Sequence, residues 1–533
     1  MERNGKPPIK SKRYKNRMSK KLEKEFQELI KVVRERDEKA DIEKIKFAWE
    51  FAKIAHTDQK RLSGEPFANH PLQVAKILAD WRLDSTSIVA ALLHDTIEDG
   101  GATRKDIVKE FGEEVALLVD GVTKVTSLRL KGSKEEEYTE NLRKLLLVMA
   151  KDLRVVLVKL ADRFHNMRTL SALPVNSQKE NAIETLEIYA PLAERMGVGE
   201  IKGQLEDLAF PFVHPKEYKK TVESSKSHYK EVESYIGKMR KVLLGKLAKE
   251  NIKATIHGRK KHLYSLWIKL NRPEINWDFD KIHDVVAIRI IVDSIPQCYT
   301  ALGVVHSIYR PVPNIGISDF IAQPKPNGYR SIHTKVFDPG RRIVEIQIRT
   351  NEMHEQAEFG IAAHWAYGDA KSMGVKDVLL EKRGVKADKS KLLWVKELIK
   401  WQNEMTDSKE FLEAVRFDAL HHRNFVFSPM GDVYDLPDGS TPVDFAYAVH
   451  SDFGNFVRGA RADGKMVPLD YKLKSGQVVE ILKSKTPNVN VDWLEFAVTT
   501  VARREIKKYV HGKREATITD DKNEHLRKKD KKR

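Results

Sequence analysis

Apolar residues recur at helical spacing along the first part of the chain, from about residue 22 to residue 212. This spacing links two groups: Phe47, Phe51, Ile54 and Ala55, and then Val74, Ile77, Leu78 and Trp81. Apolar residues three and four positions apart fall on one face of a helix. Because strand-like alternation is scarce here, the pattern predicts an all-α domain over residues 22–215. Residues 216–250, rich in Lys, Glu and Ser, are predicted to form exposed linking helices.

The pattern changes after Ile252, where strand-like segments begin. Residues 284–292 form a strongly β-branched run, and residues 343–349 alternate strictly between apolar positions and the polar residues Glu345, Gln347 and Arg349. Such alternation is typical of a strand with one buried face. Helical patterns surround both segments, so an α/β or α+β domain is predicted over residues 251–410.

A third domain is predicted over residues 423–485. Short apolar segments there flank two turn-forming groups, Pro429-Met430-Gly431-Asp432 and Pro437-Asp438-Gly439, which is typical of a small β-rich module. Residues 486–533 are predicted to form a C-terminal helix and a charged tail. At the other end, residues 1–21 are strongly basic and are expected to be a disordered arm.

Composition narrows the class of protein. A chain of 533 residues holds roughly three or four domains, and its formal charge of +18 favours polyanionic partners such as nucleotides, RNA or the ribosome. The single cysteine, Cys298, excludes a disulfide framework and a cysteine-based zinc module, and it fits a reducing cytosol. No apolar run approaches the ~18–20 residues that span a bilayer, and the N-terminus lacks the core of a signal peptide. We therefore expect a cytoplasmic protein with no membrane partner.

The strongest candidate chemistry lies where the apolar run 88–93 meets the polar stretch His94-Asp95-Thr96-Ile97-Glu98-Asp99. Helical spacing would place His94 beside Glu98 and Asp95 beside Asp99. Three carboxylates and an imidazole at the end of a buried helix are costly unless they are paired or bind a cation. A solvated helix end is the alternative.

His70 and Asp162 also stand at the ends of apolar segments. With His94 and Asp95 they form a set of two imidazoles and two carboxylates, which suits Mn²⁺, Fe or Zn²⁺ and leaves positions open for water. A metal ion there would lower the pKa of bound water, and the two acids one turn further along are candidate acceptors of its proton. The pattern is a signature of HD-type phosphohydrolases, with scattered core histidines as the alternative.

Residues 258–270 in the second domain combine an apolar stripe with a basic one at helical spacing, which predicts an amphipathic helix. Arg259 and Lys261 are candidates for charge-assisted contacts to a polyphosphate, although a solvated basic face is the alternative. The patterns GxxxxGK[ST] and GxGxxG do not occur in the sequence, which disfavours a P-loop or a Rossmann site. Residues 354–358 are a near miss for HExxH and predict an ordinary helix.

Asp284 and Glu345 stand on the two predicted strands of this domain. Two carboxylates on neighbouring strands are a common means of holding Mg²⁺ during phosphoryl transfer. Residues 325–334 add a turn that carries Tyr329, which is either a base-stacking side chain or an ordinary turn residue.

Taken together, these segments resemble the long RelA/SpoT homologues over roughly residues 40–505. The first domain carries the resemblance in Arg61-Leu62-Ser63-Gly64-Glu65-Pro66-Phe67, His70-Pro71, His94-Asp95-Thr96-Ile97-Glu98-Asp99 and Lys159-Leu160-Ala161-Asp162-Arg163-Phe164-His165-Asn166-Met167-Arg168-Thr169. The family makes and degrades the alarmones ppGpp and pppGpp, written (p)ppGpp, in the stringent response. The resemblance implies a multidomain protein: an all-α HD-type hydrolase domain, an α/β polymerase-β-like nucleotidyltransferase (synthetase) domain and a small β-grasp TGS domain.

For the hydrolase domain, the resemblance implies a Mn²⁺ ion held by His70, His94, Asp95 and Asp162. Water would attack the 3′-diphosphate of (p)ppGpp with help from Glu98 and Asp99, giving GDP or GTP plus pyrophosphate. The nucleotide would be held by Arg61, Ser63 and Asn166. Leu62 stands where many members have a basic residue, so the contact made there would be weaker or apolar.

For the synthetase domain, the resemblance implies transfer of pyrophosphate from ATP to the 3′-hydroxyl of GDP or GTP. The ATP phosphates would be bound by Arg259, Lys261, Ser265 and Lys269. Mg²⁺ would be held by Asp284 and Glu345, and Glu345 would also activate the hydroxyl. GDP or GTP would be bound by Lys325, Asn327, Tyr329 and His333. Gly316-Ile317-Ser318-Asp319 departs from the family motif that influences the choice of acceptor, which leaves GDP versus GTP open.

The third domain resembles a TGS module, which in long members meets the tRNA acceptor end on the ribosome. His450 is a candidate contact, or a structural histidine. The sequence stops before the zinc-finger-like and ACT modules that usually follow. Two alternatives to a bifunctional enzyme stay open: a hydrolase with a regulatory or degenerate synthetase domain, and a ribosome- or tRNA-binding regulatory protein. The oligomeric state is open as well.

Overall fold

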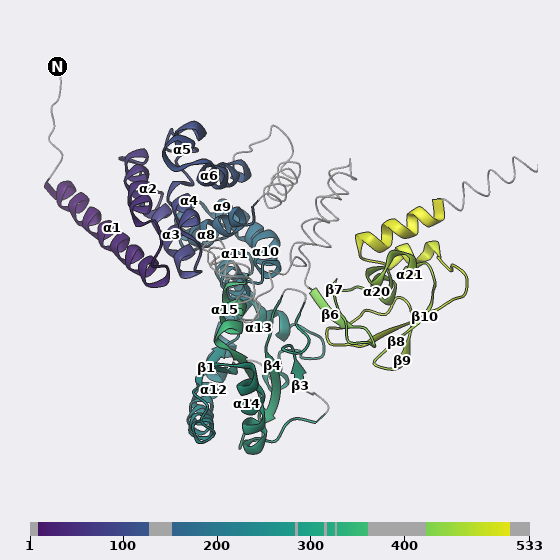
Figure 1. Ribbon diagram of the computed structural model, residues 1–533. Coiled ribbons are helices and arrows are strands. Elements are labelled where there is room, and N and C mark those ends of the chain that lie inside the picture. Colours follow the sequence, from purple (N-terminus) through teal and green to yellow (C-terminus); the bar gives the residue numbers. More distant parts are fainter. Residues whose placement is uncertain are drawn as a thin grey trace, which may run out of the picture. The chain divides into compact units, whose positions relative to one another are not determined.

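A computed structural model describes residues 9–126, 152–282, 286–313, 317–325, 328–360 and 423–511. The chain forms two compact units (Figure 1). The first unit comprises residues 1–318 and 328–404, and the second comprises residues 319–327 and 405–533. Among the described residues, every helix is too short or too polar to cross a membrane.

The first predicted domain is all-α in its described part, as expected. Its helices are α1 (Ile9–Arg36), α2 (Ile42–Ala55), α3 (Asn69–Asp80), α4 (Ser85–Leu93), α5 (Arg104–Phe111), α6 (Glu113–Thr126), α8 (Arg154–Arg168), α9 (Val175–Glu184), α10 (Ala190–Arg195) and α11 (Gly199–Val213). A 3₁₀ turn covers Leu170–Ala172, and a π-helical turn, Thr185–Tyr189, joins α9 to α10. Helix α4 packs against α2, α3, α6 and α8, so its last residues end inside the domain.

The basic arm predicted at residues 1–21 is wrong from Ile9 onward, because α1 begins there. The apolar side chains of the second half of α1 are buried: Leu22, Phe26, Leu29, Ile30 and Val33. Phe26 stacks on Trp49 of α2 with ring centroids 5.4 Å apart. Docking of this stripe stabilises the helix, and the basic residues before it extend the same helix.

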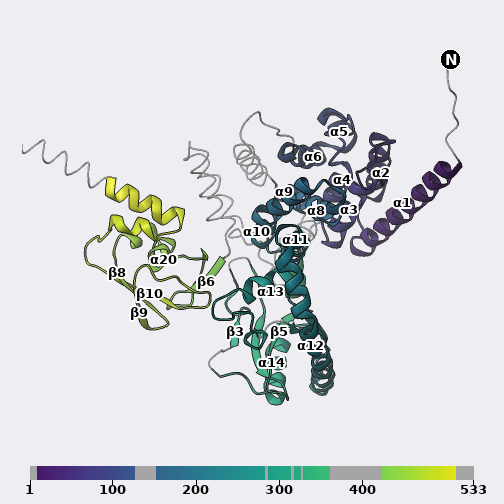
Figure 2. The same cartoon turned by 180° about the vertical axis from the view of Figure 1, so that it is seen from behind.

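One helix, α12 (Pro215–Lys249, 35 residues), replaces the several linking helices predicted over residues 216–250. Proline at its first turn suits a helix start, since that position needs no backbone N–H. Figure 1 shows α12 running beside β1 and α14 of the next domain, with which it is in contact, and Figure 2 shows α12 and α14 from behind.

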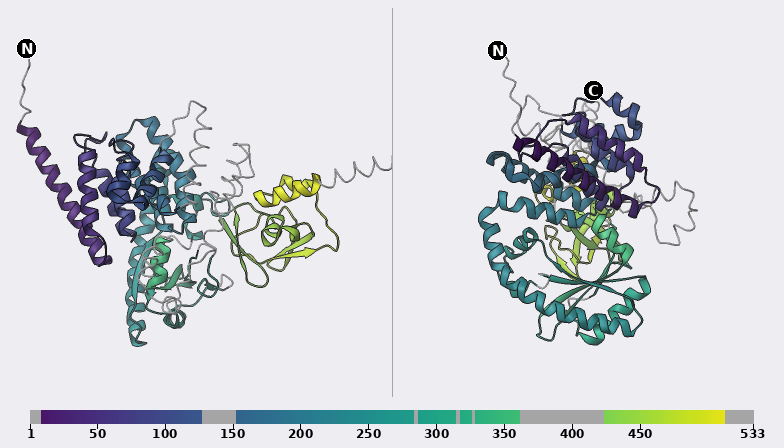
Figure 3. Two further views of the ribbon diagram at one scale, coloured as in Figure 1. Left: turned by 45° about the horizontal axis from the view of Figure 1, so that its top comes forward. Right: turned by 90° about the vertical axis from the view of Figure 1, so that its left-hand side faces the viewer.

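The second domain contains a five-stranded mixed sheet (Figure 3, right). Its strand order is β1-β2-β5-β4-β3. The strands are β1 (Thr255–Lys260), β2 (Val286–Val292), β3 (Ile317–Asp319), β4 (Ile332–Phe337) and β5 (Ile343–Thr350). The β1–β2 and β4–β5 pairs are antiparallel, and β2–β5 is parallel. The helices are α13 (Leu263–Leu270), α14 (Ile295–Ile308) and α15 (Asn351–Phe359), with a 3₁₀ turn at Phe279–Lys281. The predicted α/β domain is confirmed.

Two details of the strand and helix assignments differ from the sequence pattern. The basic residues of 258–260 lie in β1 and not on a helix, because α13 begins only at Leu263. The polar side of β5 is also buried rather than solvated, and Arg349 is only 1% exposed. Helix α15 packs against β5 and β2, so this side of the sheet is covered.

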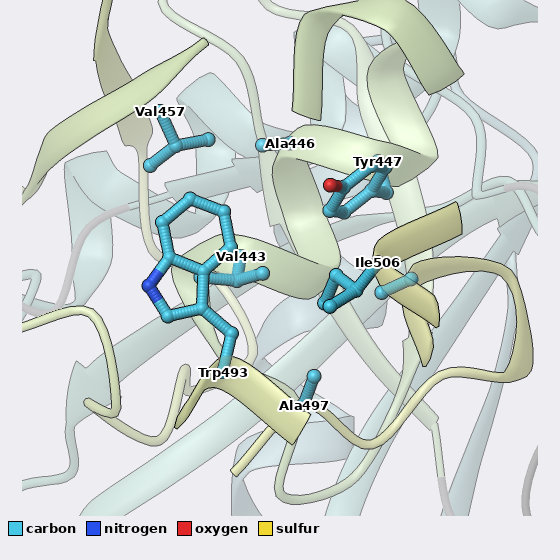
Figure 4. Packing of buried hydrophobic residues seen from close by; sticks show 8 residues of the cluster. Val443, Ala446, Tyr447, Val457, Trp493, Ala497 and Ile506 are labelled. Carbon is cyan, nitrogen blue, oxygen red and sulfur yellow. The ribbon is translucent and has the colours of Figure 1, made fainter. Parts of the chain in front are cut away.

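The second unit contains the predicted β-rich module. Its elements are β6 (Arg423–Phe427), β7 (Val433–Pro437), α20 (Pro442–Val449), α21 (Ser451–Gly454), β8 (Val457–Ala462), β9 (Lys465–Val467), β10 (Val479–Lys483), a 3₁₀ turn at Val491–Glu495 and a helix at 500–511. The strands form the hairpin β6–β7 and a three-stranded sheet, β10-β8-β9. Trp493, Ala497 and Ile506 pack against Val443 and Tyr447 of α20 (Figure 4). The predicted C-terminal helix is therefore part of this core.

Asp444 connects α20 to the segment that leads into the last helix. Its carboxylate is fully buried and accepts hydrogen bonds from the backbone N–H and hydroxyl of Thr441, both at 2.8 Å. It also accepts from the N–H of Val498 at 2.9 Å, and from the N–H and hydroxyl of Thr499 at 2.7 and 2.9 Å. This one carboxylate therefore accepts hydrogen bonds at the start of α20 and also holds the backbone 54 residues further along the chain.

We predict that Asp444→Ala destabilises the second unit by about 3 kcal/mol or more, because several buried donors lose their acceptor. Hydrogen exchange of residues 442–449 and 498–506 would report the loss. Asp438→Ala, at an exposed turn position of the same unit, is the control. Unchanged protection in the Asp444 variant would show that the carboxylate is dispensable.

Candidate metal centre and anion site

Four predicted ligands converge where three buried helices meet. His70 is the second residue of α3, His94 and Asp95 follow the last residue of α4, and Asp162 lies in the middle of α8. His70, His94 and Asp162 are buried, and their ligand atoms all lie within 4.8 Å of one another. The sequence places these residues far apart, and helix packing brings them together.

Asp95 completes the group from its more open side. His94 Nε2 lies 3.0 Å from Asp95 Oδ1, and His70 Nε2 lies 3.6 Å from Asp95 Oδ2 and 3.1 Å from Asp162 Oδ1. The Asp95 side chain is 18% exposed, whereas those of both histidines are at most 3% exposed. Water and substrate therefore have access from the side of Asp95.

The chemistry of His94 fits a metal ligand. Its Nδ1 lies 2.8 Å from the carbonyl oxygen of Ala91, and a carbonyl can only accept, so the ring proton is on Nδ1. The Nε2 lone pair then faces the cluster, and among the described residues this buried atom has no hydrogen-bond partner. An orphaned buried nitrogen is costly, and a divalent cation would use its lone pair.

Buried charge is balanced on the α8 side of the group. Lys159 Nζ lies 2.8 Å from Asp162 Oδ2, and both side chains are buried. Burial alone would raise the pKa of Asp162, but the Lys159 ammonium and His70 outweigh it and hold that pKa well below its usual value. Burial lowers the pKa of His70. The carboxylate is thus ionised and the imidazole neutral, as metal ligation requires.

Glu98 and Asp99 lie next to this group but not on α4. Helix α4 ends at Leu93, and residues 94–99 form turns, one of which is closed by a 2.9 Å bond from Asp99 N–H to the Asp95 carbonyl. Burial and the nearby Asp95 raise the pKa of both acids. A raised pKa suits a carboxylate that accepts a proton.

The predicted nucleotide-binding residues surround the open side. Arg61 donates from Nη2 to Asn166 Oδ1, and Asn166 donates from Nδ2 to Asp162 Oδ1 at 2.6 Å. Leu62 and Ser63 lie at the exposed tip of a tight loop closed by the Arg61–Glu65 backbone bond. The structure brings Arg61 and Asn166 to the metal group and leaves Ser63 on the rim.

Two further residues belong to this group and received no role from the sequence pattern, Lys159 and His165. Both are buried on α8, three residues before and three residues after Asp162. Burial and the neighbouring His70 lower the pKa of His165 to about 3. The i±3 spacing around Asp162 was the signal, since it places both on the same face of the helix.

A second group of functional side chains lies on β4 and β5. His333 Nδ1 lies 3.1 Å from Glu345 Oε1, Gln347 donates to the same oxygen at 2.9 Å, and the Tyr329 hydroxyl lies 2.8 Å from His333 Nε2. The structure therefore brings together three predicted residues, Tyr329, His333 and Glu345. Asp284, Asn327 and Gly316 lie outside the described residues. Lys325 belongs to the second unit, where its ammonium lies over the Phe320 and Phe425 rings.

Two buried arginines beside Glu345 were missed by the sequence analysis. Arg289 of β2 and Arg349 of β5 share one carboxylate, Glu358 of α15, with Oε1 at 2.8 Å from Arg289 Nη1 and 3.6 Å from Arg349 Nη2. Among the described residues, the Nε and Nη2 atoms of both are buried without a hydrogen-bond partner. Burial lowers the pKa of Arg349, and the positive charge of Arg289 acts in the same direction, so that this pKa is about 10.

These orphaned guanidinium donors form a candidate anion site. Two buried cations share a single carboxylate, and charge-assisted bonds to a polyphosphate would satisfy the remaining donors. Burial, together with the positive charges of Arg349 and Arg289, lowers the pKa of His354 to about 3. The signal was present in the sequence, since both arginines occupy polar positions of otherwise apolar strands.

The predicted ATP-binding residues lie on β1 and α13, facing acidic residues of α11. Ser265 donates to Glu206 at 3.3 Å, and Arg259 Nη2 lies 3.5 Å from Glu200. Lys261 lies between β1 and α13, and Lys269 lies in the last turn of α13. Two of the four predicted phosphate ligands therefore contact carboxylates from the first domain.

His262 forms the centre of this contact. Its Nδ1 lies 2.8 Å from Asp207, and its Nε2 lies 3.6 Å from Glu200. Burial opposes the charged form, but the two acids outweigh it and raise the pKa of His262 to about 9. The bond with His262 lowers the pKa of Glu200 to about 2. A Cβ at Gly203 of α11 would lie 2.1 Å from the His262 ring, so only glycine permits this approach.

Three known domain families match three successive parts of the chain. Residues 48–199 match the HD domain family, residues 258–372 match the family described as a region found in RelA / SpoT proteins, and residues 424–483 match the TGS domain family. The predicted order of domains is confirmed.

Three curated relatives are similar over most of the chain. A GTP pyrophosphokinase of Myxococcus xanthus is 47% identical over 88% of this chain and 60% of its own length. A guanosine-3′,5′-bis(diphosphate) 3′-pyrophosphohydrolase of Aquifex aeolicus is 44% identical over 88% of this chain and 64% of its length. A bifunctional (p)ppGpp synthase/hydrolase RelA of Mycobacterium tuberculosis is 44% identical over 90% of this chain and 64% of its length. The chain thus spans about 60% of the length of these relatives.

We predict that the α11–α13 contact weakens in alkaline solution. The pKa of His262 is about 9 in the folded protein and near 6.5 when unfolded, so its stabilisation is complete below pH 6.5 and is lost as pH rises through 9. The expected loss is about 2 kcal/mol. Hydrogen exchange of residues 199–213 from pH 6.5 to 9.5, corrected for intrinsic exchange rates, measures it.

His262→Gln should remove this pH dependence, whereas His450→Gln in the second unit should retain it. If α11 in the wild-type protein is equally protected at both ends of the range, the ion pairs do not hold the contact.

Proposed function

The chain belongs to the RelA/SpoT family, and we propose that it is a bifunctional enzyme that hydrolyses (p)ppGpp and also makes it. The hydrolytic half rests above all on one observation: the buried Nε2 of His94 faces His70, Asp95 and Asp162, and among the described residues its lone pair receives no hydrogen bond. The activities for which the relatives are named support both halves.

In the hydrolase site, His70, His94, Asp95 and Asp162 would hold a divalent cation, which we propose is Mn²⁺. The bound cation would lower the pKa of a coordinated water molecule. Glu98 and Asp99, with their raised pKa values, would accept the proton from the attacking water. Attack on the phosphorus bonded to O3′ would break that P–O bond, the proton would pass on to O3′ to give GDP or GTP, and pyrophosphate would be the other product.

Nucleotide binding in this site would use the side chains on its open rim. Arg61 presents a guanidinium anchored to Asn166, and such a fork binds phosphate oxygens by charge-assisted hydrogen bonds. Ser63 on the exposed loop would add a hydroxyl contact. Exposed Leu62 offers an apolar surface to the nucleoside.

In the synthetase site, Arg289 and Arg349 would bind phosphates together with Arg259, Lys261, Ser265 and Lys269. Their orphaned donors support this proposal. Asp284 and Glu345 would hold Mg²⁺, and Glu345 would accept the proton of the acceptor 3′-hydroxyl. Transfer of the β,γ-diphosphate of ATP to that oxygen would release AMP. Tyr329 would stack on the acceptor base, with His333 beside it.

One observation favours a second candidate, in which the synthetase domain is a regulatory nucleotide-binding module. Arg259 and Ser265 contact Glu200 and Glu206 of α11, so ATP phosphates would have to displace these carboxylates. Activity assays with ATP and GDP separate the two candidates, because a regulatory module binds nucleotide without making product.

The second unit would meet the acceptor end of tRNA on the ribosome, as its TGS match suggests. His450 is mostly exposed, and its Nδ1 accepts the Asp452 N–H at 3.2 Å to start α21. Its Nε2 edge is the proposed contact. We place the protein in the cytoplasm, where these nucleotides and ribosomes are found.

We predict that single substitutions separate the two activities. Asp95→Ala should lower Mn²⁺-dependent ppGpp hydrolysis more than about 100-fold and spare synthesis, and Glu345→Ala should do the reverse. Product analysis after incubation with ppGpp and Mn²⁺, or with ATP, GDP and Mg²⁺, tests both. Loss of both activities in either folded variant would contradict two separate sites.

We predict that Arg349→Gln raises the KM for ATP or GDP about 10-fold or more, because a buried charge-assisted contact is worth about 1.5–3 kcal/mol. Exposed Arg272→Gln is the matched control. Unchanged ppGpp hydrolysis would show that the variant is folded, and an unchanged KM would remove Arg349 from the phosphate site.

A further inference from the structure

One ring nitrogen in the hydrolase site lies within hydrogen-bond distance of two other side chains. His165 Nδ1 lies 2.8 Å from Nδ1 of His70 and 3.1 Å from Nη1 of Arg61. His70 is a proposed metal ligand and Arg61 is proposed to bind the nucleotide. A single atom, His165 Nδ1, therefore contacts both the metal-binding and the nucleotide-binding side chains. His165 itself has no role in the proposed function.

The positions of the protons on these three side chains follow from their chemistry. His70 Nε2 faces the Asp162 and Asp95 carboxylates, so a metal ligated there takes the Nε2 lone pair and leaves the ring proton on Nδ1. Arg61 has donors only. Both groups must therefore donate, and His165 Nδ1 must be the acceptor of both, with its own proton on Nε2.

The two metal-facing histidines obtain their outer partners in different ways. His94 donates to the carbonyl oxygen of Ala91, which belongs to its own helix end. His70 donates to a side chain of another helix, α8, where His165 is buried with its ring centroid 5.0 Å from that of His70. Because Asp162 lies one turn earlier on α8, the same rigid helix supplies a ligand and the partner that orients a second ligand.

We propose that His165 is a positioning residue that joins metal binding to nucleotide binding. Its Nδ1 lone pair holds His70 in the tautomer that presents Nε2 to the metal, and it also aims the Arg61 guanidinium. A metal ion that fixes the His70 ring also fixes the His165 ring, and the Arg61 guanidinium held by that ring keeps its other N–H donors for a phosphate. Nucleotide and metal then favour each other's binding, and this linkage is reciprocal.

The test compares three variants at this position. His165→Asn can place its amide oxygen where Nδ1 lies and so keeps an acceptor. His165→Leu has nearly the same shape as the Asn variant without the acceptor. His165→Gln is polar, but its amide group reaches the Nε2 position and not Nδ1. Circular dichroism and thermal melting of the metal-free proteins establish which variants are folded.

The first measurement is Mn²⁺ affinity, by calorimetry on the full-length metal-free protein without nucleotide. The Leu and Gln variants should bind Mn²⁺ about 10–100-fold more weakly than wild type, as is usual when the outer partner of a metal ligand is lost. The Asn variant should stay within a few-fold of wild type. Wild-type affinity in the Leu and Gln variants, or an equal loss in all three, would overturn the proposal.

The second measurement is ppGpp hydrolysis, which rests on the proposed function. At saturating Mn²⁺ the Leu variant should regain most of its kcat but keep a several-fold higher KM, because Arg61 has lost its anchor, whereas the Asn variant should keep the wild-type KM. A KM in the Leu variant equal to that of wild type would refute the link to Arg61. If wild-type protein does not hydrolyse ppGpp, the proposed function fails, while the Mn²⁺ titration still decides the role of His165.

Discussion

The buried carboxylate of Asp162 is the constraint on which the first domain depends. It lies in the middle of α8, where it accepts from Lys159 at 2.8 Å and from Asn166 at 2.6 Å, and His70 Nε2 of α3 lies 3.1 Å away. An ionised group without these partners would cost several kcal/mol in such a setting. Lys159 and Asn166 belong to α8 itself, whereas His70 belongs to α3, so the Asp162 face of α8 is turned toward α3 and the metal group lies between the two helices.

Two helices of the first unit contact both the domain of the metal group and the domain of the anion site. Helix α11 is in contact with α8 of the first domain and with α13 and α15 of the second. Glu358 of α15 contacts the arginines of the anion site. Glu355 of the same helix lies 2.7 Å from Arg82, in the loop that follows α3. A displacement of either helix would change contacts in both domains, which suits the proposed enzyme, whose two reactions oppose each other.

Agreement between sequence and structure follows the range of the interactions involved. Helical periodicity and β-branched runs report local preferences, and the all-α domain and the strands β2 and β5 were predicted from them. The start of α13 was misjudged because the pattern of residues 258–270 suits a helix throughout, while pairing with β2 draws residues 258–260 into β1. The buried polar face of β5 was misjudged because a strand's alternation does not reveal what covers each face.

The sequence by itself determined which residues are available for chemistry: the His-Asp pairs, the paired acids after α4, and the arginines at polar strand positions. These follow from side-chain type and spacing. Only the tertiary structure decided how they act, because the deciding contacts join distant parts of the chain. Helix packing leaves His94 Nε2 orphaned beside His70, sets Glu206 against Ser265, and makes His165 the common acceptor for Arg61 and His70. Burial then gives each of these contacts its strength, since a charge or lone pair shielded from water must be satisfied by the protein or by a ligand.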